Sequence, residues 1–421
     1  MATSTHGGSV PAISPRDQGV RAPTGAAILA NSDEAIMAAR ELAAQFLHGA
    51  AARDAERALL SREVEQLSRS GIYSLTVPAE LGGPDVPQST VAEVLRTIAT
   101  ADPSIAQIPQ SHFVYVKLLR WAGTAEQRKD LLSQVLAGAR FGNAQSEAGS
   151  PTLDKIQATL IPDGDDYLLT GEKFYCTGAL FAHIVPVLAK TPDGGAYVAY
   201  VPRDTEGLDI VDDWAGMGQR TTASGTVRLT SLRVPRSAVV HRDPLFEGPQ
   251  TFGAFAQILH TAIDVGIARG ALNEAVSFVQ TRSRPWFEAG VSRAADDPLL
   301  VQRIGELAVG VRAAEALLTE AGRVLDIAEA AWQAGRLDER LAAESSIAVA
   351  TAKTVADRVS VETASALFEV CGTRSAAESL NLDRHWRNAR THTLHDPVRW
   401  KLQHIGRWTL NGTPPPRHGL L

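Results

Sequence analysis

The sequence predicts an α+β protein of several domains, in which a helical region, a β region and a second helical region follow one another. Three observations lead to this fold class. Apolar residues near the N-terminus recur at three- and four-residue spacing, the middle of the chain has short β-type runs between turn residues, and two long apolar stripes follow residue 300. A chain of 421 residues exceeds one ordinary core, so two or three domains are expected.

The first helical region is predicted to cover residues 31–140. Apolar side chains recur at helical spacing over residues 36–47, and Asn31 with Glu34 three residues later matches an N-terminal cap. Gly71 matches a helix stop. Further helices are expected over residues 90–100, 112–122 and 126–136.

The β region is predicted to cover residues 141–245. Its expected strands are residues 156–161, 167–170, 184–189, 197–201 and 226–234. Asp163-Gly164 separates the first two strands, and Pro192-Asp193-Gly194-Gly195 separates the next two, so both pairs are predicted to form hairpins.

The second helical region is predicted to cover residues 250–421. One apolar stripe runs from Ile304 to Leu325, and another runs from Ile347 to Leu367. Stripes of this kind are typical of helices that form a bundle core or a subunit interface, so no chemistry is assigned to them.

Composition excludes several classes of protein. The net charge of -6 gives no bulk attraction to nucleic acid, and no apolar run reaches the length of a membrane span. Residues 1–30 lack the apolar core of a signal peptide and are expected to form a mobile tail. The two cysteines, Cys176 and Cys371, form no CxxC pair, which favours a reducing, cytoplasmic location.

Common motifs of nucleotide and hydrolase sites are also missing from the sequence. No GxGxxG follows a predicted strand, and the chain contains neither a P-loop nor a Gly-x-Ser-x-Gly elbow. The sequence therefore gives no support for nucleotide binding by a doubly wound sheet.

Chemical groups concentrate in residues 387–397, Arg-Asn-Ala-Arg-Thr-His-Thr-Leu-His-Asp-Pro. The rings of His392 and His395 can donate, accept or carry a proton near neutral pH, and Asp396 can orient one of them. Two other interpretations stay open. The segment could ligate a metal, although no cysteine or carboxylate cluster accompanies it, or it could form an interhelical hydrogen-bonded pair.

Three segments of the β region are unusual for plain strands and loops. They are residues 142–150, 171–179 and 214–225, and each mixes glycine with small hydroxyl and amide side chains. Such groups can meet the polar edge of a flat heterocycle. Each segment taken singly could be an ordinary loop, but the three in this order are a more specific signal.

From about residue 35 onward the chain resembles the acyl-CoA dehydrogenase superfamily. The resemblance implies an N-terminal helical domain, a middle β-barrel or sandwich domain and a C-terminal four-helix bundle, usually assembled as a homotetramer. The three segments would be its flavin-contacting loops. Arg284, or Arg282 close by, would reach a flavin phosphate across a subunit interface, and Arg374 would belong to the glycine-rich element near the flavin.

One departure from that superfamily points to a particular branch. The glutamate base that commonly precedes Gly-Thr is missing, and His395-Asp396 stands in the corresponding region. This version is similar to the flavin-dependent monooxygenases typified by dibenzothiophene monooxygenase and by the bacterial sulfur-acquisition oxidoreductases. The branch implies reduced FMN from a separate NAD(P)H:FMN reductase, formation of a C4a-hydroperoxyflavin with O2, and oxygenation of an organosulfur compound. FAD is the alternative cofactor.

The resemblance also implies roles for individual residues. His395 would hydrogen-bond the flavin peroxide, and Asp396 would orient His395 or contact the flavin edge. His392 would lie behind that pair or on the substrate side. Asn143 and Thr177 would face the flavin or the substrate.

Further contacts are implied with less specific roles. Candidate flavin contacts are Ser146, Cys176, Trp214 and Ser224. Trp214 would wall the flavin pocket, with a buried core tryptophan as the alternative. His112 and Tyr115 would face the substrate cavity, with packing as the alternative.

Three other functions stay open from the sequence. The first is an FAD-dependent acyl-CoA dehydrogenase with its base elsewhere. The second is a metal-dependent hydrolase built on His392, His395 and Asp396. The third is a scaffold without catalysis. The sulfur compound itself is not identified, since sulfide, sulfone, thiophene-like and amine substrates all fit.

Overall fold

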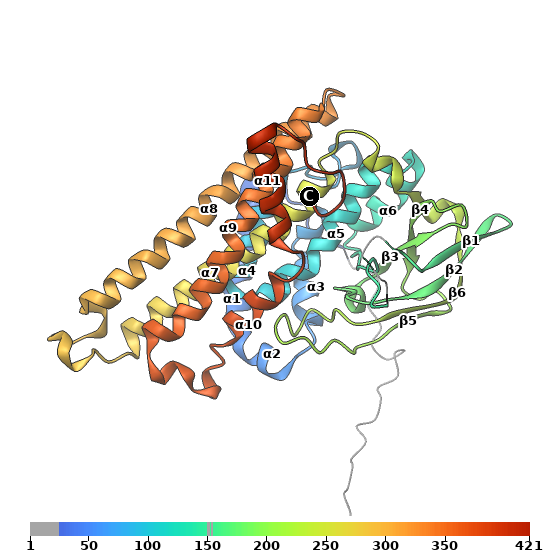
Figure 1. Cartoon of the computed structure of the whole chain (residues 1–421). Helices are drawn as coiled ribbons and strands as arrows, with labels where there is room; N and C mark the ends of the chain where they lie inside the picture. The colour runs from blue at the N-terminus through green and yellow to red at the C-terminus, as the bar shows by residue number, and fades with distance from the viewer. Residues whose placement is uncertain (1–24, 150–151, 153–154) are drawn as a thin grey trace, which may run out of the picture.

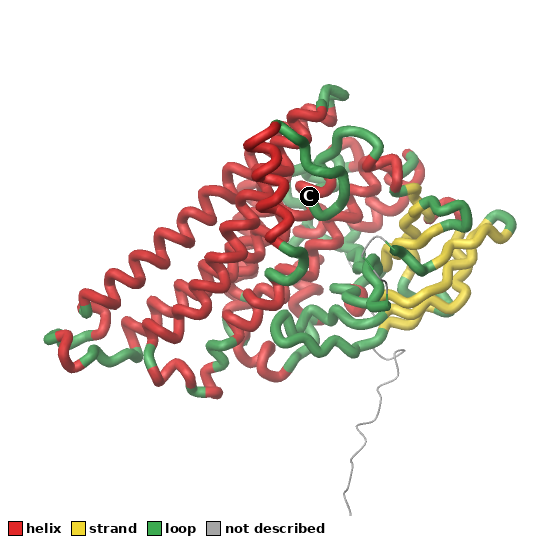
Figure 2. The backbone as a smooth tube through the Cα atoms, in the orientation of Figure 1, coloured by secondary structure: helices red, strands yellow, loops and turns green. Residues whose placement is uncertain are grey.

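The computed structural model describes residues 25–149, 152 and 155–421. Figures 1 and 2 show a long helical body with a β domain against one side of it. The elements follow the predicted order of helices, strands and helices. Residues 1–24, most of the predicted tail, lie outside the described residues.

The N-terminal helices are α1 (Ser32–Leu47), α2 (Ala50–Glu56), α3 (Ser61–Arg69), α4 (Gln88–Ala101), α5 (Pro103–Ala122) and α6 (Ala125–Leu136). Asn31 caps α1 as predicted, since its side-chain oxygen accepts a hydrogen bond from the Glu34 amide at 3.0 Å. α5 begins well before the predicted start at residue 112, because Asp102 caps it and Pro103 fits its first turn.

The described residues of the β domain form one sheet of seven strands in the order β5-β6-β2-β1-β3-β4-β7. The strands are β1 (Thr159–Asp163), β2 (Asp166–Lys173), β3 (Ile184–Lys190), β4 (Ala196–Pro202), β5 (Leu208–Ile210), β6 (Val227–Pro235) and β7 (Val239–His241). Both predicted hairpins are present, because β1 pairs with β2 and β3 pairs with β4 in antiparallel register. The sequence did not predict β5 and β7, which are three residues long and too short for a clear alternation.

The C-terminal helices are α7 (Phe252–Thr281), α8 (Pro298–Gln333), α9 (Glu339–Cys371), α10 (Arg384–His392) and α11 (Val398–Asn411). The two predicted apolar stripes lie on α8 and α9, where Leu307, Leu325 and Leu367 are buried. Residues 252–268 of α7 are all buried, and the helix packs against α9 and α8 as well as α4 and α5. A polar side chain in this part of α7 is therefore carried into the interior, where it needs a partner.

Within the described residues, no helix combines the length and the apolarity that crossing a bilayer requires.

Candidate active site

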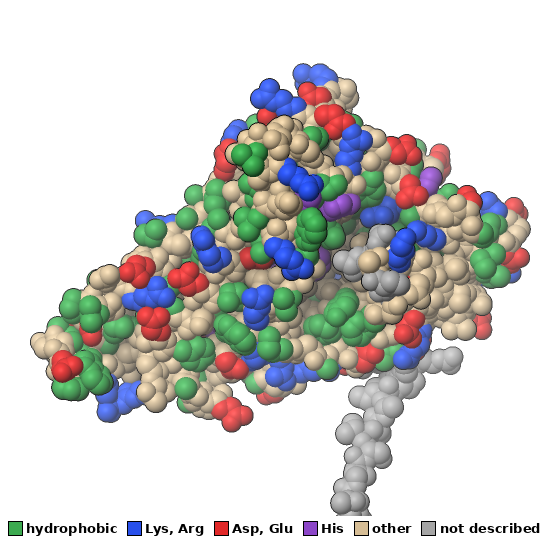
Figure 3. All heavy atoms as spheres, viewed as in Figure 1, with side chains coloured by type: hydrophobic (Ala, Val, Ile, Leu, Met, Phe, Trp, Pro, Cys, Tyr) green, Lys and Arg blue, Asp and Glu red, His purple; other side chains and the backbone are tan. Residues whose placement is uncertain are grey.

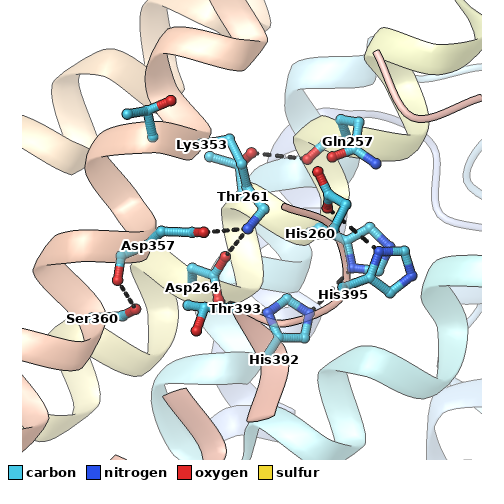
Figure 4. Close-up of polar contacts among 12 residues, drawn as sticks. Gln257, His260, Thr261, Asp264, Lys353, Asp357, Ser360, His392, Thr393 and His395 are labelled. Carbon is cyan, nitrogen blue, oxygen red and sulfur yellow. Dashed lines mark hydrogen bonds and ion pairs between the residues drawn. The ribbon is translucent and has the colours of Figure 1, made fainter. Parts of the chain in front are cut away.

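The predicted His-Asp segment meets two polar residues of α7. His260 and Asp264 stand four residues apart on α7, so both face the same side of the helix. Nδ1 of His392, at the end of α10, lies 2.6 Å from Oδ1 of Asp264, and Nε2 of His392 lies 3.2 Å from Nδ1 of His260. The ring of His395 stacks on His260, with centroids 3.8 Å apart and planes inclined by 34° (Figure 4).

Lys353 of α9 lies on the far side of Asp264 from the histidines. Nζ of Lys353 lies 2.9 Å from Oδ2 of Asp264, and both side chains are fully buried. Lys353 also pairs with Asp357 one turn further along α9 (Figure 4). Burial alone would raise the pKa of Asp264, but Lys353 and His392 outweigh it and hold that pKa well below its usual range. Asp264 is therefore ionised and accepts the Nδ1 hydrogen of His392.

His395 is held from its other side by Asp396. Nδ1 of His395 lies 3.5 Å from Oδ1 of Asp396, and Nζ of Lys401 on α11 lies 2.7 Å from Oδ2 of the same carboxylate. Burial opposes ionisation of Asp396, yet His395 and Lys401 hold its pKa far below the usual range. Among the described residues, none is hydrogen-bonded to Nε2 of His395, so this nitrogen can meet another partner.

The ring of His395 is exposed to solvent, whereas the rings of His260 and His392 are buried. The His395 side chain is 39% exposed, whereas His260 and His392 retain 3% and 2% of their accessible surface. Figure 3 shows histidine side chains at the surface beside the hollow between the helical body and the β domain. His395 is thus the ring of the three that a bound molecule can reach.

The second and third glycine-rich segments meet through hydroxyl groups. Oγ1 of Thr177 lies 2.7 Å from Oγ of Ser224, which lies 2.7 Å from Oγ1 of Thr222. All three side chains are buried. Cys176 is also buried, and burial raises the pKa of its thiol, so it is a packing residue at neutral pH and not a nucleophile.

Asn143 of the first segment joins the site to α5. The hydroxyl of Tyr115 donates to Oδ1 of Asn143 at 3.0 Å, and Nδ2 of Asn143 donates to the Tyr175 carbonyl at 3.2 Å. Burial raises the pKa of Tyr115, which stays a neutral donor. Ser146 of the same segment accepts from the Phe174 amide through its backbone carbonyl, and its half-buried side chain lies beside this pair of loops.

The third segment docks on α10, close to His392. The amide of Gln219 donates to Oδ1 of Asn388 at 2.7 Å, and the amide of Gly218 donates to Oγ1 of Thr391 at 2.9 Å. A Cβ atom at Gly218 would lie 2.0 Å from the Arg387 carbonyl oxygen, so glycine is needed for this close approach. The contact places the third segment against α10, the helix that ends at His392.

Backbone strain is concentrated in the same loops. Tyr175, Gln219 and Ala223 have positive φ angles of 58°, 51° and 48°, a region that non-glycine residues seldom adopt. Such residues cluster at functional sites because the surrounding structure must hold them there. The half-buried Trp214 supports this loop, since its Nε1 donates to the Gln219 carbonyl at 2.8 Å.

His112 is buried, and both of its ring nitrogens are hydrogen-bonded to backbone groups. Its Nε2 donates to the Tyr73 carbonyl at 2.8 Å, and its Nδ1 accepts from the Phe141 amide at 3.0 Å. Burial lowers the pKa of His112 to about 3, so the ring is neutral. Both nitrogens are taken by backbone groups, which fits the packing alternative.

The two candidate phosphate-binding arginines, and the Arg374 predicted for the glycine-rich element near the flavin, lie at the opposite end of α7. Arg282, Arg284 and Arg374 are exposed, and Nη1 of Arg374 donates to the Arg282 carbonyl at 3.0 Å. From His260 to the end of α7 at Thr281 the helix rises about 32 Å. Within one chain, these arginines and His395 therefore cannot contact the same flavin.

Sequence reasoning did not find His260, Asp264 or Lys353. One signal was present, since a histidine and an aspartate four residues apart interrupt an otherwise apolar helix. A buried charge of this kind requires a partner. The partner lies 128 residues away along the chain, which the pattern does not reveal.

Three family models match the chain in order. The acyl-CoA dehydrogenase N-terminal domain matches residues 31–139, the middle domain matches residues 141–232, and the C-terminal domain matches residues 258–400. The chain belongs to the acyl-CoA dehydrogenase family. The predicted fold class is thereby confirmed.

Relatives of this acyl-CoA dehydrogenase family member include flavin-dependent monooxygenases. Dibenzothiophene monooxygenase of Rhodococcus erythropolis is 34% identical, over 96% of this chain and 98% of its own length. A probable FMNH2-dependent monooxygenase, SfnC of Pseudomonas putida, is 32% identical over 90% and 96%. The crystal structure of FMN-bound TdsC from Paenibacillus sp. A11-2 has a TM-score of 0.87 and 30% identity, and covers 92% of this chain and all of TdsC. The predicted resemblance to the monooxygenase branch is confirmed.

The residues of the site fit a flavin. Tyr115, Asn143 and the Thr177–Ser224 pair offer polar groups around the strained loops. The side-chain amide of Gln219 is buried, and neither its nitrogen nor its oxygen has a hydrogen-bond partner among the described residues. Unused buried donors and acceptors are costly unless a ligand meets them.

Metal binding has no comparable support. Both ring nitrogens of His392 are engaged by Asp264 and His260, so this ring cannot join His395 and Asp396 around an ion. Among the described residues, no group of three or more His, Cys, Asp and Glu side chains could hold a metal ion.

Proposed function

We propose that this protein is a monooxygenase that uses reduced FMN, supplied by a separate NAD(P)H-dependent reductase, to transfer one oxygen atom of O2 to an organosulfur compound. The observation that carries the proposal is His395, a reachable ring fixed by Asp396 where many family members have a glutamate base. Relatives over nearly the whole length of the chain, among them dibenzothiophene monooxygenase and FMN-bound TdsC, support the same reading.

The chain's own residues have distinct tasks in this proposal. Bound reduced FMN supplies the two electrons and the position at which O2 is activated. His395 presents Nε2 to the reacting oxygen and moves the proton with which the second oxygen atom leaves as water. Oδ1 of Asp396 lies 3.5 Å from the opposite ring nitrogen of His395, a contact that favours the ring orientation with Nε2 turned away from this carboxylate.

Asn143 and the hydroxyl pair orient the bound molecules. Tyr115 donates to Oδ1 of Asn143, so the amide orientation is fixed and its Nδ2 group faces the strained loop at Tyr175. The hydroxyl of Thr222 donates to the Gln219 carbonyl, so Ser224 donates to Thr222 and Thr177 donates to Ser224. Oγ1 of Thr177 can therefore accept a hydrogen bond from a ligand. The buried surroundings of Thr177 and Ser224 exclude water, which would otherwise divert the activated oxygen to hydrogen peroxide.

We further propose that the protein is a homotetramer acting in the cytoplasm. Arg282, Arg284 and Arg374 of one subunit would reach the flavin phosphate of a neighbour, since the length of α7 keeps them from the site of their own chain. Exposed Trp286 and Phe287 beside them support a covered surface at this end.

The test is an anaerobic titration with reduced FMN, followed by rapid mixing with oxygen-18 gas and dibenzothiophene or a small aliphatic sulfone. Mass spectrometry then asks whether the sulfur product carries oxygen-18. A labelled product supports the proposal. If no product forms, and the purified protein instead carries FAD that octanoyl-CoA bleaches, the protein is a dehydrogenase and the proposal is wrong.

A further inference from the structure

Five buried side chains stand behind His395, and the tasks above do not use them. We name them the buried cluster: His260, Asp264, Lys353, Asp357 and His392 (Figure 4). They come from α7, α9 and α10, so the packing of three helices is needed to assemble them. His395 stacks on the cluster through His260 and reaches solvent.

The charges of this region do not balance. The titratable groups that face His260 and His395 are Asp264 on α7, Lys353 and Asp357 on α9, His392 on α10, Asp396 in the following loop and Lys401 on α11. Three carboxylates therefore stand against two lysines. A surplus negative charge in a buried region favours the uptake of one proton.

Few places can hold that proton. Burial, with the nearby His395 and His392, lowers the pKa of His260 far below its usual range, so this ring stays neutral. Burial and the charge of Asp264 raise the pKa of Asp357, which makes its carboxyl one place for the proton. The rings of His392 and His395 flank His260 on either side.

A neutral His260 also links the two outer rings. Asp264 accepts the Nδ1 hydrogen of His392, so a neutral His392 offers Nε2 as an acceptor and His260 must donate from Nδ1. A proton on His392 reverses that hydrogen bond and moves the hydrogen of His260 to its other nitrogen. The stack between His260 and His395 contains no hydrogen bond, so the cluster acts on His395 through charge and ring position.

We propose that the buried cluster holds one exchangeable proton and, by its charge, determines whether His395 is protonated when oxygen reacts. The proposal rests on the proposed function, in which His395 moves a proton. His260, Asp264, Lys353, Asp357 and His392 are then positioning residues, which touch neither substrate nor flavin and act through His395.

The test uses flavin-free, full-length protein and diethyl pyrocarbonate, which acylates uncharged imidazole. Peptide mass spectrometry gives the acylation rate of His395 at several pH values, with the exposed His241 of β7 as a reference in the same sample. Asp264→Asn removes the surplus negative charge, so His395 should be acylated about three- to ten-fold faster near neutral pH. Lys353→Met increases the surplus, so acylation should be slower by a similar factor.

Opposite signs are the decisive result, because a merely structural disturbance would expose His395 in both variants and raise both rates. Equal rates in the two variants, or changes of the same sign, would overturn the proposal. If Lys353→Met does not fold, Lys353→Gln takes its place: it also removes the positive charge but keeps a donor for Asp264, so acylation should again be slower, and an unchanged or higher rate contradicts the proposal. The control is His385→Gln, a buried histidine of α10 that faces Glu274, which should leave the rate unchanged.

A second readout separates this proposal from the proposed function. Product formed per reduced FMN, measured against pH, should shift toward lower pH in Asp264→Asn and toward higher pH in Lys353→Met. If neither variant nor wild type oxygenates sulfur, but the acylation rates still move in opposite directions, the cluster acts on His395 and the proposed function is wrong. If oxygenation is intact and its pH profile is the same in all variants, the cluster proposal is wrong.

Discussion

The imidazole of His392 and the carboxylate of Asp264 lie 2.6 Å apart with both side chains fully buried. An ionised carboxylate accepts hydrogen bonds and cannot donate, so this contact determines which nitrogen of His392 carries the hydrogen. Lys353 on the far side keeps Asp264 ionised. Through this pair, His392 of the predicted His-Asp segment lies in the core of the helical bundle.

Replacement of His395 should stop oxygenation without unfolding the protein. His395→Ala removes a partly exposed ring, so folding and oligomeric state should be unchanged. Product formation should fall by at least about 100-fold, since general acid–base groups contribute on that scale, and hydrogen peroxide should appear instead. Product and peroxide are measured together per reduced FMN consumed. His241→Ala is the matched surface control, and unchanged coupling in His395→Ala would remove this residue from the chemistry.

The hydroxyl of Thr177 can be tested by two substitutions of similar size. Thr177→Ser keeps the 2.7 Å contact with Ser224, whereas Thr177→Val keeps the volume and loses the oxygen. Loss of one hydrogen bond should weaken reduced-FMN affinity by about three- to ten-fold in the valine variant and hardly in the serine variant. Anaerobic fluorescence titration gives both dissociation constants. Equal affinities in the two variants would mean that the hydroxyl does not serve the flavin.

The sequence carries its clearest signals where residues are contiguous or periodic. His395 and Asp396 are neighbours within one short segment, and the stripes on α8 and α9 repeat over many residues. His260 and Lys353 were missed because their partners lie far away along the chain. Their contacts depend on helix packing, which the local spacing of residues does not reveal.

Strand prediction failed for a related reason. β5 and β7 have three residues each and join the sheet through pairing with β6 and β4. Three residues carry too little alternation to predict a strand. β5 and β7 are the two outer strands of the sheet, and their position is determined by pairing with distant residues and not by a local sequence pattern.

Acid should destabilise the protein partly through His112. The folded-state pKa of this ring is lowered to about 3, whereas an unfolded histidine has a pKa near 6.5. Below pH 6.5 the unfolded chain therefore binds a proton that the folded chain rejects, and stability falls as the pH falls. The loss should be about 1.4 kcal/mol for each pH unit between 6.5 and 3.

Substitution of His112 should flatten that pH dependence. His112→Gln can keep a donor for the Tyr73 carbonyl and an acceptor for the Phe141 amide. It should cost about 1–3 kcal/mol at pH 7 and decline less steeply between pH 6.5 and 5. Urea unfolding at several pH values measures both effects. His241→Gln, at an exposed site, should follow the wild-type profile, and a parallel profile for His112→Gln would contradict the assignment.

Binding of the flavin phosphate should depend on arginines just beyond the C-terminal end of α7. Arg284→Ala removes an exposed cation just beyond Thr281, where α7 ends about 32 Å from His260, so any effect on flavin must come through a neighbouring subunit. Loss of a charge-assisted hydrogen bond should weaken reduced-FMN affinity by about ten-fold or more. Arg282→Ala distinguishes the two candidates, and Arg293→Ala, which breaks only the pair with Asp296, is the control. Light scattering on each variant shows whether the oligomer persists. If affinity falls only in Arg282→Ala, that residue takes the role, and if neither variant binds reduced FMN more weakly, the phosphate is held elsewhere.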